Sequence, residues 1–60
     1  MNEINEAINN LELMSKTLEN MANRPENYNT YYSVYLEQYS WELYKMSKEL
    51  TQIGYAFGGV

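Results

Sequence analysis

Residues 31–44 read YYSVYLEQYSWELY, and this stretch decides the fold because it carries a strict helical repeat. Apolar and aromatic residues recur at alternating spacings of four and three. The repeat comprises Tyr32, Leu36, Tyr39, Leu43, Met46, Leu50, Ile53 and Phe57. This alternation is the a/d pattern of helices that pack against each other in a coiled coil. We therefore predict a helix over about residues 27–53, ending before Gly54.

The first third of the chain carries a matching repeat. Its members are Ile4, Ala7, Leu11, Met14, Leu18 and Met21. The opposite side of the helical wheel is almost entirely polar, so the pattern predicts an amphipathic helix over about residues 2–23. Glu3 and Glu6 fall in its first turns, where the helix dipole favours negative charge.

The sequence NRPEN, residues 23–27, interrupts the helical pattern. Proline disfavours helical backbone in the preceding residue, and Asn23 is suited to a left-handed helix end. Asn27, Asn29 and Thr30 are all candidate N-caps for the second helix. A connection this short makes the two helices antiparallel neighbours. We predict an all-α fold, an antiparallel two-helix hairpin over residues 1–54, followed by a non-helical aromatic and glycine-rich tail over residues 55–60.

The chain is too short to bury a large core. Sixty residues fall below the size at which one core usually supplies more than about 3–5 kcal/mol, and no cysteine is present to form a disulfide. A lone hairpin also leaves one side of its a/d seam exposed to water. We therefore predict a homodimer that forms a four-helix bundle. The serines at positions 33, 40 and 47 repeat every seven residues at the edge of this seam, which favours close helix approach.

The residue types exclude most catalytic chemistry. Nucleophilic catalysis usually needs an activated Ser, Cys or Lys beside a base, and this chain has neither histidine nor cysteine. Glu42 and Glu49 lie one heptad apart, where pairing with lysine is the simpler interpretation. No phosphate-binding glycine loop is present. We predict that the protein is not an enzyme and that it uses no cofactor and no metal.

The net charge of −4 bears on the possible partners. The four basic residues form no stripe, so we expect no direct nucleic-acid binding and no membrane association. No long apolar segment is present, which predicts a soluble protein of the cytoplasm, or of the host cytoplasm if the protein is viral. Glutamates along two helices also allow a third function, a DNA-mimicking inhibitor.

A second aromatic surface lies outside the a/d seam. On the helical wheel, Val34 and Trp41 fall on the outer side of the second helix, flanked by tyrosines. We predict a protein interface at Tyr31, Val34, Tyr35, Gln38, Trp41, Tyr44 and Lys45. Interfaces favour Trp and Tyr, and soluble monomers rarely expose large apolar patches. The alternative interpretation is that self-association buries this surface in a structural or assembly homo-oligomer.

The chain is small, acidic, rich in asparagine and tyrosine, and free of cofactor motifs. In this composition it resembles the accessory proteins of bacteriophages and other mobile elements. Such proteins commonly bind one host protein and block or redirect it. The resemblance implies a protein that inhibits or modulates a protein target, here through the outer aromatic surface.

Overall fold

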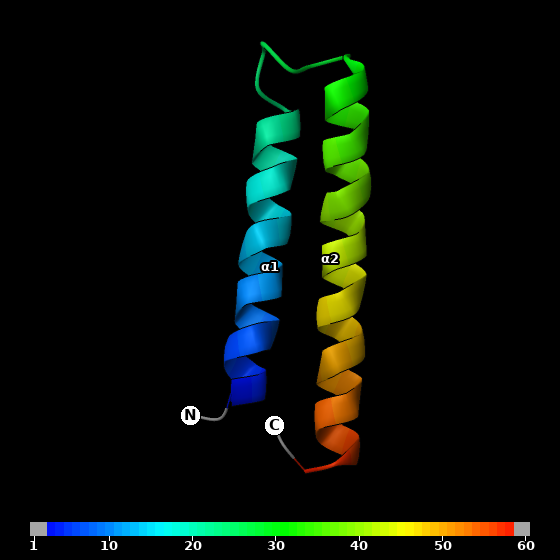
Figure 1. Ribbon diagram of the computed structural model, residues 1–60. Helices are drawn as coiled ribbons and strands as arrows, with labels where there is room; N and C mark the ends of the chain where they lie inside the picture. Colours follow the sequence, from blue (N-terminus) through cyan, green and yellow to red (C-terminus); the bar gives the residue numbers. More distant parts are fainter. Residues whose placement is uncertain (1–2, 59–60) are drawn as a thin grey trace.

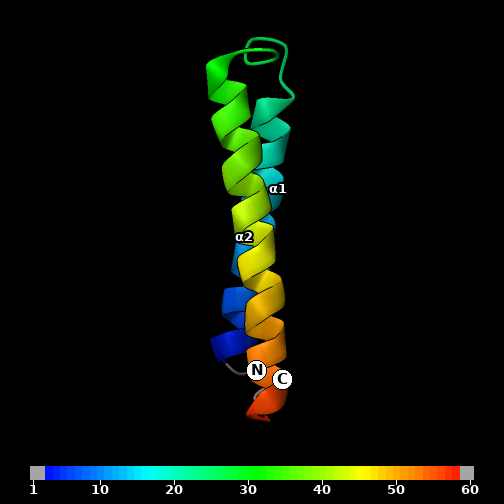
Figure 2. The ribbon, with the colours of Figure 1, turned by 90° about the vertical axis from the view of Figure 1, so that its right-hand side faces the viewer.

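Two antiparallel helices make up the computed structural model, which describes residues 3–58 (Figure 1). Helix α1 spans Glu3–Ala22 and helix α2 spans Tyr31–Ala56. The helices lie side by side along their whole shared length, and two perpendicular views agree on this (Figures 1 and 2). Within the described residues there is no strand. The predicted all-α helical hairpin is confirmed.

Helix α2 begins at Tyr31 because Thr30 caps it. The Thr30 hydroxyl accepts a hydrogen bond from the Ser33 backbone N–H at 3.2 Å. The Ser33 hydroxyl in turn accepts from the Thr30 N–H at 3.3 Å, which completes a capping box. Asn29, immediately before the cap, has a φ of 63°. The predicted start near residue 27 is therefore wrong, because left-handed backbone at Asn29 interrupts any helix that begins earlier.

The turn between the helices is closed by its own hydrogen bonds. The Asn27 side-chain amide donates to the Met21 carbonyl at 2.8 Å, and the Arg24 N–H donates to the same carbonyl at 3.3 Å. These bonds satisfy a carbonyl that the end of α1 would leave unpaired. The left-handed end predicted at Asn23 does not occur. Among the described residues other than glycine, Asn29 alone has a positive φ.

Helix α2 continues past its predicted end. It runs through Gly54 to Ala56, where the Phe57 N–H donates to the Ile53 carbonyl at 3.1 Å. The predicted stop before Gly54 is wrong because Gly54 is buried and continues the seven-residue series of small side chains. Burial there outweighs the roughly 1 kcal/mol that glycine costs in a helix. The rest of the predicted tail is turn at residues 57–58, and residues 59–60 lie outside the described part.

Small side chains form the centre of the helix–helix interface. They recur every seven residues and are buried on both helices: Ser33, Ser40, Ser47 and Gly54 on α2, and Ser15 and Ala22 on α1. Ser47 has 0% and Ala22 1% of its surface exposed. Small residues at a helix contact let the two backbones approach closely. The close approach that the serine repeat predicted is therefore observed.

The predicted seam is partly wrong. Leu36 is buried and Leu43 and Leu50 are half-buried, as the a/d repeat predicted. The other members on α2, however, are about half exposed: Tyr32, Tyr39, Met46 and Ile53. On α1, Ile8, Ser15 and Ala22 are buried, whereas Ala7 and Met14 of the predicted seam are exposed and Met21 is half-buried. The helix–helix contact is centred on the small residues rather than on the predicted seam, because bulky tyrosines would hold the two helices apart.

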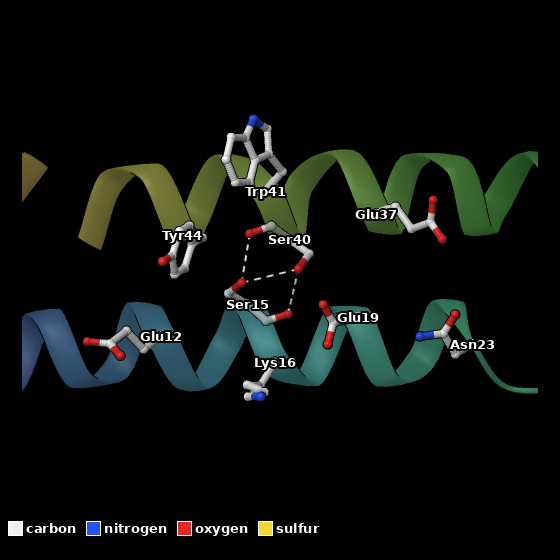
Figure 3. A pocket seen from close by; sticks show the side chains of 9 residues that line it. All are labelled: Glu12, Ser15, Lys16, Glu19, Asn23, Glu37, Ser40, Trp41 and Tyr44. Atoms are coloured by element: carbon white, nitrogen blue, oxygen red, sulfur yellow. Dashed lines mark hydrogen bonds between the residues drawn. The ribbon is translucent and has the colours of Figure 1, made fainter. Parts of the chain in front are cut away.

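A reciprocal hydrogen-bonded pair joins the helices near their middle. The Ser15 hydroxyl donates to the Ser40 carbonyl at 2.8 Å, and the Ser40 hydroxyl donates to the Ser15 carbonyl at 2.8 Å (Figure 3). The two hydroxyl oxygens are 3.1 Å apart. We call this pair the serine clasp. It satisfies both buried hydroxyls, and it sets the register by placing residue 15 level with residue 40.

The hairpin buries little apolar surface. Among the described residues, only Ile8, Ala22 and Leu36 are buried and apolar. The accessible surface of 4704 Å² exceeds the roughly 4100 Å² typical of a compact monomer of 7.1 kDa. The radius of gyration of 13.7 Å likewise exceeds the value of about 10 Å for a compact chain of this length. The hairpin is a single layer of two helices, with two large faces open.

Candidate protein-binding site

The two sides of the helix–helix interface differ in chemistry. On one side lies an open groove of about 550 Å³ whose walls come from both helices. Its lining comprises Glu12, Ser15, Lys16, Glu19, Asn23, Glu37, Ser40, Trp41 and Tyr44 (Figure 3). The serine clasp forms the floor, and three glutamates and one lysine give the walls a net negative charge. We call it the acidic groove.

Two stacked aromatic rings border the acidic groove on α2. The ring centroids of Trp41 and Tyr44 are 5.7 Å apart, and the rings are inclined by 22°. Residues three apart on a helix are neighbours on its surface, so helical geometry alone brings these rings together. Figure 3 shows Trp41 projecting from α2 on the side away from α1. The Trp41 side chain is 58% exposed, so the stack faces solvent.

Each ring is contacted by a lysine side chain from one turn further along α2. The Lys45 ammonium lies 5.9 Å from the centre of the Trp41 ring, and the Lys48 ammonium lies 5.0 Å from the centre of the Tyr44 ring. These are cation–π contacts at i+4 spacing, which add modest stability at exposed sites. Across residues 3–58, no lysine or arginine forms an ion pair with a glutamate of the same part of the chain. No carboxylate of the groove lies within ion-pair distance of a described lysine or arginine, although Lys16 lines the same groove.

All seven residues of the predicted interface are exposed on α2, and we call them the outer patch: Tyr31, Val34, Tyr35, Gln38, Trp41, Tyr44 and Lys45. The structure brings three of them into contact, namely Trp41, Tyr44 and Lys45. Tyr31 and Val34 instead border a shallow depression at the start of α2. Helical geometry puts Tyr35 at the opposite border, next to Tyr39 and about 120° around the helix from Trp41.

The predicted interface residues leave out two parts of this site. Lys48 contacts the Tyr44 ring, and its i+4 spacing from Tyr44 was the available signal. The glutamates at positions 12, 19 and 37 line the groove, but they entered the sequence-based predictions only through the charge of the helices. Their assembly beside Tyr44 depends on the register between two helices, which neither repeat specifies alone.

The other side of the helix–helix interface is apolar. Helical geometry places there the residues that lie opposite the acidic groove, and we call this surface the Met–Tyr face: Ala7, Met14, Met21, Tyr32, Tyr39, Met46 and Ile53. Five of the large side chains in this face are between 49% and 53% exposed. None of the seven members is charged. The hairpin therefore presents an apolar face, an acidic groove and an aromatic outer patch.

No family model, curated protein or solved structure matches this chain in the three comparisons made. Neither helix, over the residues that the structure describes, is long and apolar enough to cross a bilayer. The same residues contain no group of three or more acidic side chains close enough to hold a metal ion. The three surfaces of the hairpin are consequently the features that indicate a function.

Proposed function

We propose that this hairpin is a small protein-binding module that works as a dimeric four-helix bundle in the cytoplasm and inhibits or modulates one protein target. The outer patch makes the contact with the target. The observation that carries the proposal is the solvent-facing stack of Trp41 on Tyr44. An exposed tryptophan that projects away from the neighbouring helix contributes little to folding. Trp and Tyr are, by contrast, the residues that most often dominate the binding energy of an interface.

The geometry of the stack favours binding because the rings are held before the target arrives. Trp41 and Tyr44 sit on successive turns of one helix, and Lys45 and Lys48 contact their ring faces. Side chains that are already ordered lose less conformational entropy when a complex forms. The tyrosine hydroxyl also gives the patch a polar edge, which keeps it hydrated until the target covers it.

The acidic groove indicates what surface the target presents. Glu12, Glu19 and Glu37 line the groove beside the ring stack and form no ion pair with another described residue. A target with basic side chains next to an apolar anchor site complements both features. The proposed action is steric, because a bound module covers the basic surface that the target otherwise uses.

Site-specific photo-crosslinking in cells that express the protein tests this function. A photoreactive amino acid at Val34, in the outer patch, should yield a covalent adduct with one larger protein. The same group at Asn20, an exposed residue of α1 outside the patch, is the matched control and should yield none. Adducts from Asn20 alone would place the target on α1. An adduct from Val34 with a second copy of this chain alone would mean that the outer patch forms the homo-oligomer.

A further inference from the structure

We infer that a second copy of this chain covers the Met–Tyr face, with α2 of each protomer lying over α1 of its partner and both turns at the same end of the bundle. The inference rests on the proposed dimeric state. It adds the surface at which the dimer forms and the arrangement of the four helices. It also leaves the acidic groove uncovered in both copies, together with the outer patch apart from Tyr35, which borders the Met–Tyr face.

The size of the Met–Tyr face matches what a stable dimer needs. The exposed halves of its five large side chains each amount to on the order of 100 Å², since an aromatic side chain presents about 150–250 Å² in all. The sum is about 500 Å², and four half-buried leucines enlarge the face: Leu11, Leu18, Leu43 and Leu50. The total approaches the roughly 800 Å² that each partner contributes to a standard interface. It exceeds the apolar patch that most monomers carry.

The chemistry of the face fits a second copy better than a charged partner. All its members are uncharged, so a charged partner would bury its charges without compensation. A two-fold dimer buries the same patch on both protomers. Because this face runs along both helices, covering it with another hairpin turns the single layer into a closed four-helix bundle.

The serine clasp selects the helix arrangement. Residue 15 lies level with residue 40, so Met14 and Tyr39 lie at nearly the same height. With α2 over the partner's α1, Tyr39 of each protomer meets a methionine of the other, and methionine sulfur packs favourably on aromatic rings.

The charges at the borders of the face favour the same arrangement. The α2 border carries Glu42 and Glu49, whereas the corresponding series on α1 is Glu3, Asn10 and Thr17 and carries a single charge. With α2 over the partner's α1, Glu42 lies between the levels of the neutral Asn10 and Thr17. With α2 over the partner's α2, they would line up against the same glutamates of the other copy, and juxtaposed like charges are unfavourable.

Sedimentation equilibrium with single lysine variants tests the surface. The wild-type protein should have twice the chain mass of 7.1 kDa. Tyr39→Lys should reduce the mass to that of one chain, while Gln52→Lys, the matched control on the outer side of α2, should remain dimeric. A wild-type monomer would contradict both the inference and the proposed dimer. A dimer that survives Tyr39→Lys but dissociates with Trp41→Ala would contradict the inference and leave the dimer standing.

Oxidative crosslinking tests the arrangement, and it also decides the case in which Tyr39→Lys fails to fold. The chain has no cysteine of its own. The double variant Met14→Cys/Tyr39→Cys should form a covalent dimer, because each cysteine meets the other position of the partner. Each single cysteine variant should form none. A covalent dimer from Tyr39→Cys alone, or none from the double variant, would overturn the arrangement.

Discussion

Replacing Ser47 with leucine is expected to remove most of the free energy of unfolding of this hairpin. Ser47 is completely buried between the helices, where its hydroxyl donates to the Tyr44 carbonyl at 2.7 Å. A leucine at this position has no space unless the two helices separate. Overpacking of this kind costs about 1–3 kcal/mol, and occasionally more. That is comparable to the total of about 3–5 kcal/mol that a core of this size supplies.

Thermal unfolding followed by circular dichroism measures this effect, with Ser47→Ala as the matched control. Alanine fits the same space and removes only a bond within one helix, so we expect a loss of about 1 kcal/mol or less. A Ser47→Leu protein with the same melting temperature as the wild type would contradict the close approach of the two helices. So would a Ser47→Ala protein that is the less stable of the two.

Replacing Trp41 with alanine is expected to weaken target binding by about 2 kcal/mol or more, which is roughly 30-fold in Kd. The free energy of unfolding should change by less than about 0.5 kcal/mol, because the tryptophan is exposed and its stacking and cation–π partners, Tyr44 and Lys45, lie on its own helix. Loss of the ring removes both the apolar anchor and the surface on which Lys45 rests. Isothermal titration calorimetry with the purified target, once photo-crosslinking has identified it, measures the change in Kd.

Tyr55→Ala is the control for this experiment. Tyr55 lies two heptads from Trp41 on the same side of α2 and is 71% exposed, but it lies outside the outer patch. Its removal should leave the Kd within about twofold, as expected for a residue outside the interface. Equal losses from Tyr55→Ala and Trp41→Ala would show that aromatic content, rather than this patch, drives binding. An unchanged Kd in Trp41→Ala would contradict the proposed function.

The sequence predicted the hairpin but placed the seam on the wrong side of the leucines. The buried Leu36 and its equivalents at 43 and 50 belong to two overlapping repeats, one completed by tyrosine and methionine, the other by serine and glycine. By hydrophobicity alone, the first repeat is the better candidate for the helix–helix interface. The structure buries the second because serine hydroxyls bond across the interface and small side chains let the backbones meet. The serine repeat can be recognised in the sequence. How much it stabilises the interface depends on these hydrogen bonds between the helices, which the sequence does not show.

The outer patch could be predicted from the sequence because it does not depend on how the two helices pack. Its members share one helix, so the wheel alone places Val34 and Trp41 away from the partner helix. The acidic groove was not predictable, because its walls come from both helices. Glu19 and Glu37 line the same groove from different helices only once the serine clasp fixes which residues of α1 and α2 lie level.

The two helices meet along their serines, which leaves the Met–Tyr face of a single hairpin open. Disulfide formation within one chain tests this most directly. Ser15→Cys/Ser40→Cys should oxidise to a bridge inside a single chain, because the native hydroxyl oxygens are only 3.1 Å apart and a disulfide needs such proximity. Met14→Cys/Tyr39→Cys should form no bridge within one chain. Mass spectrometry after oxidation distinguishes bridges within a chain from those between chains. The opposite outcome, a bridge within one chain from the Met14 and Tyr39 positions and none from the serine positions, would contradict the claim.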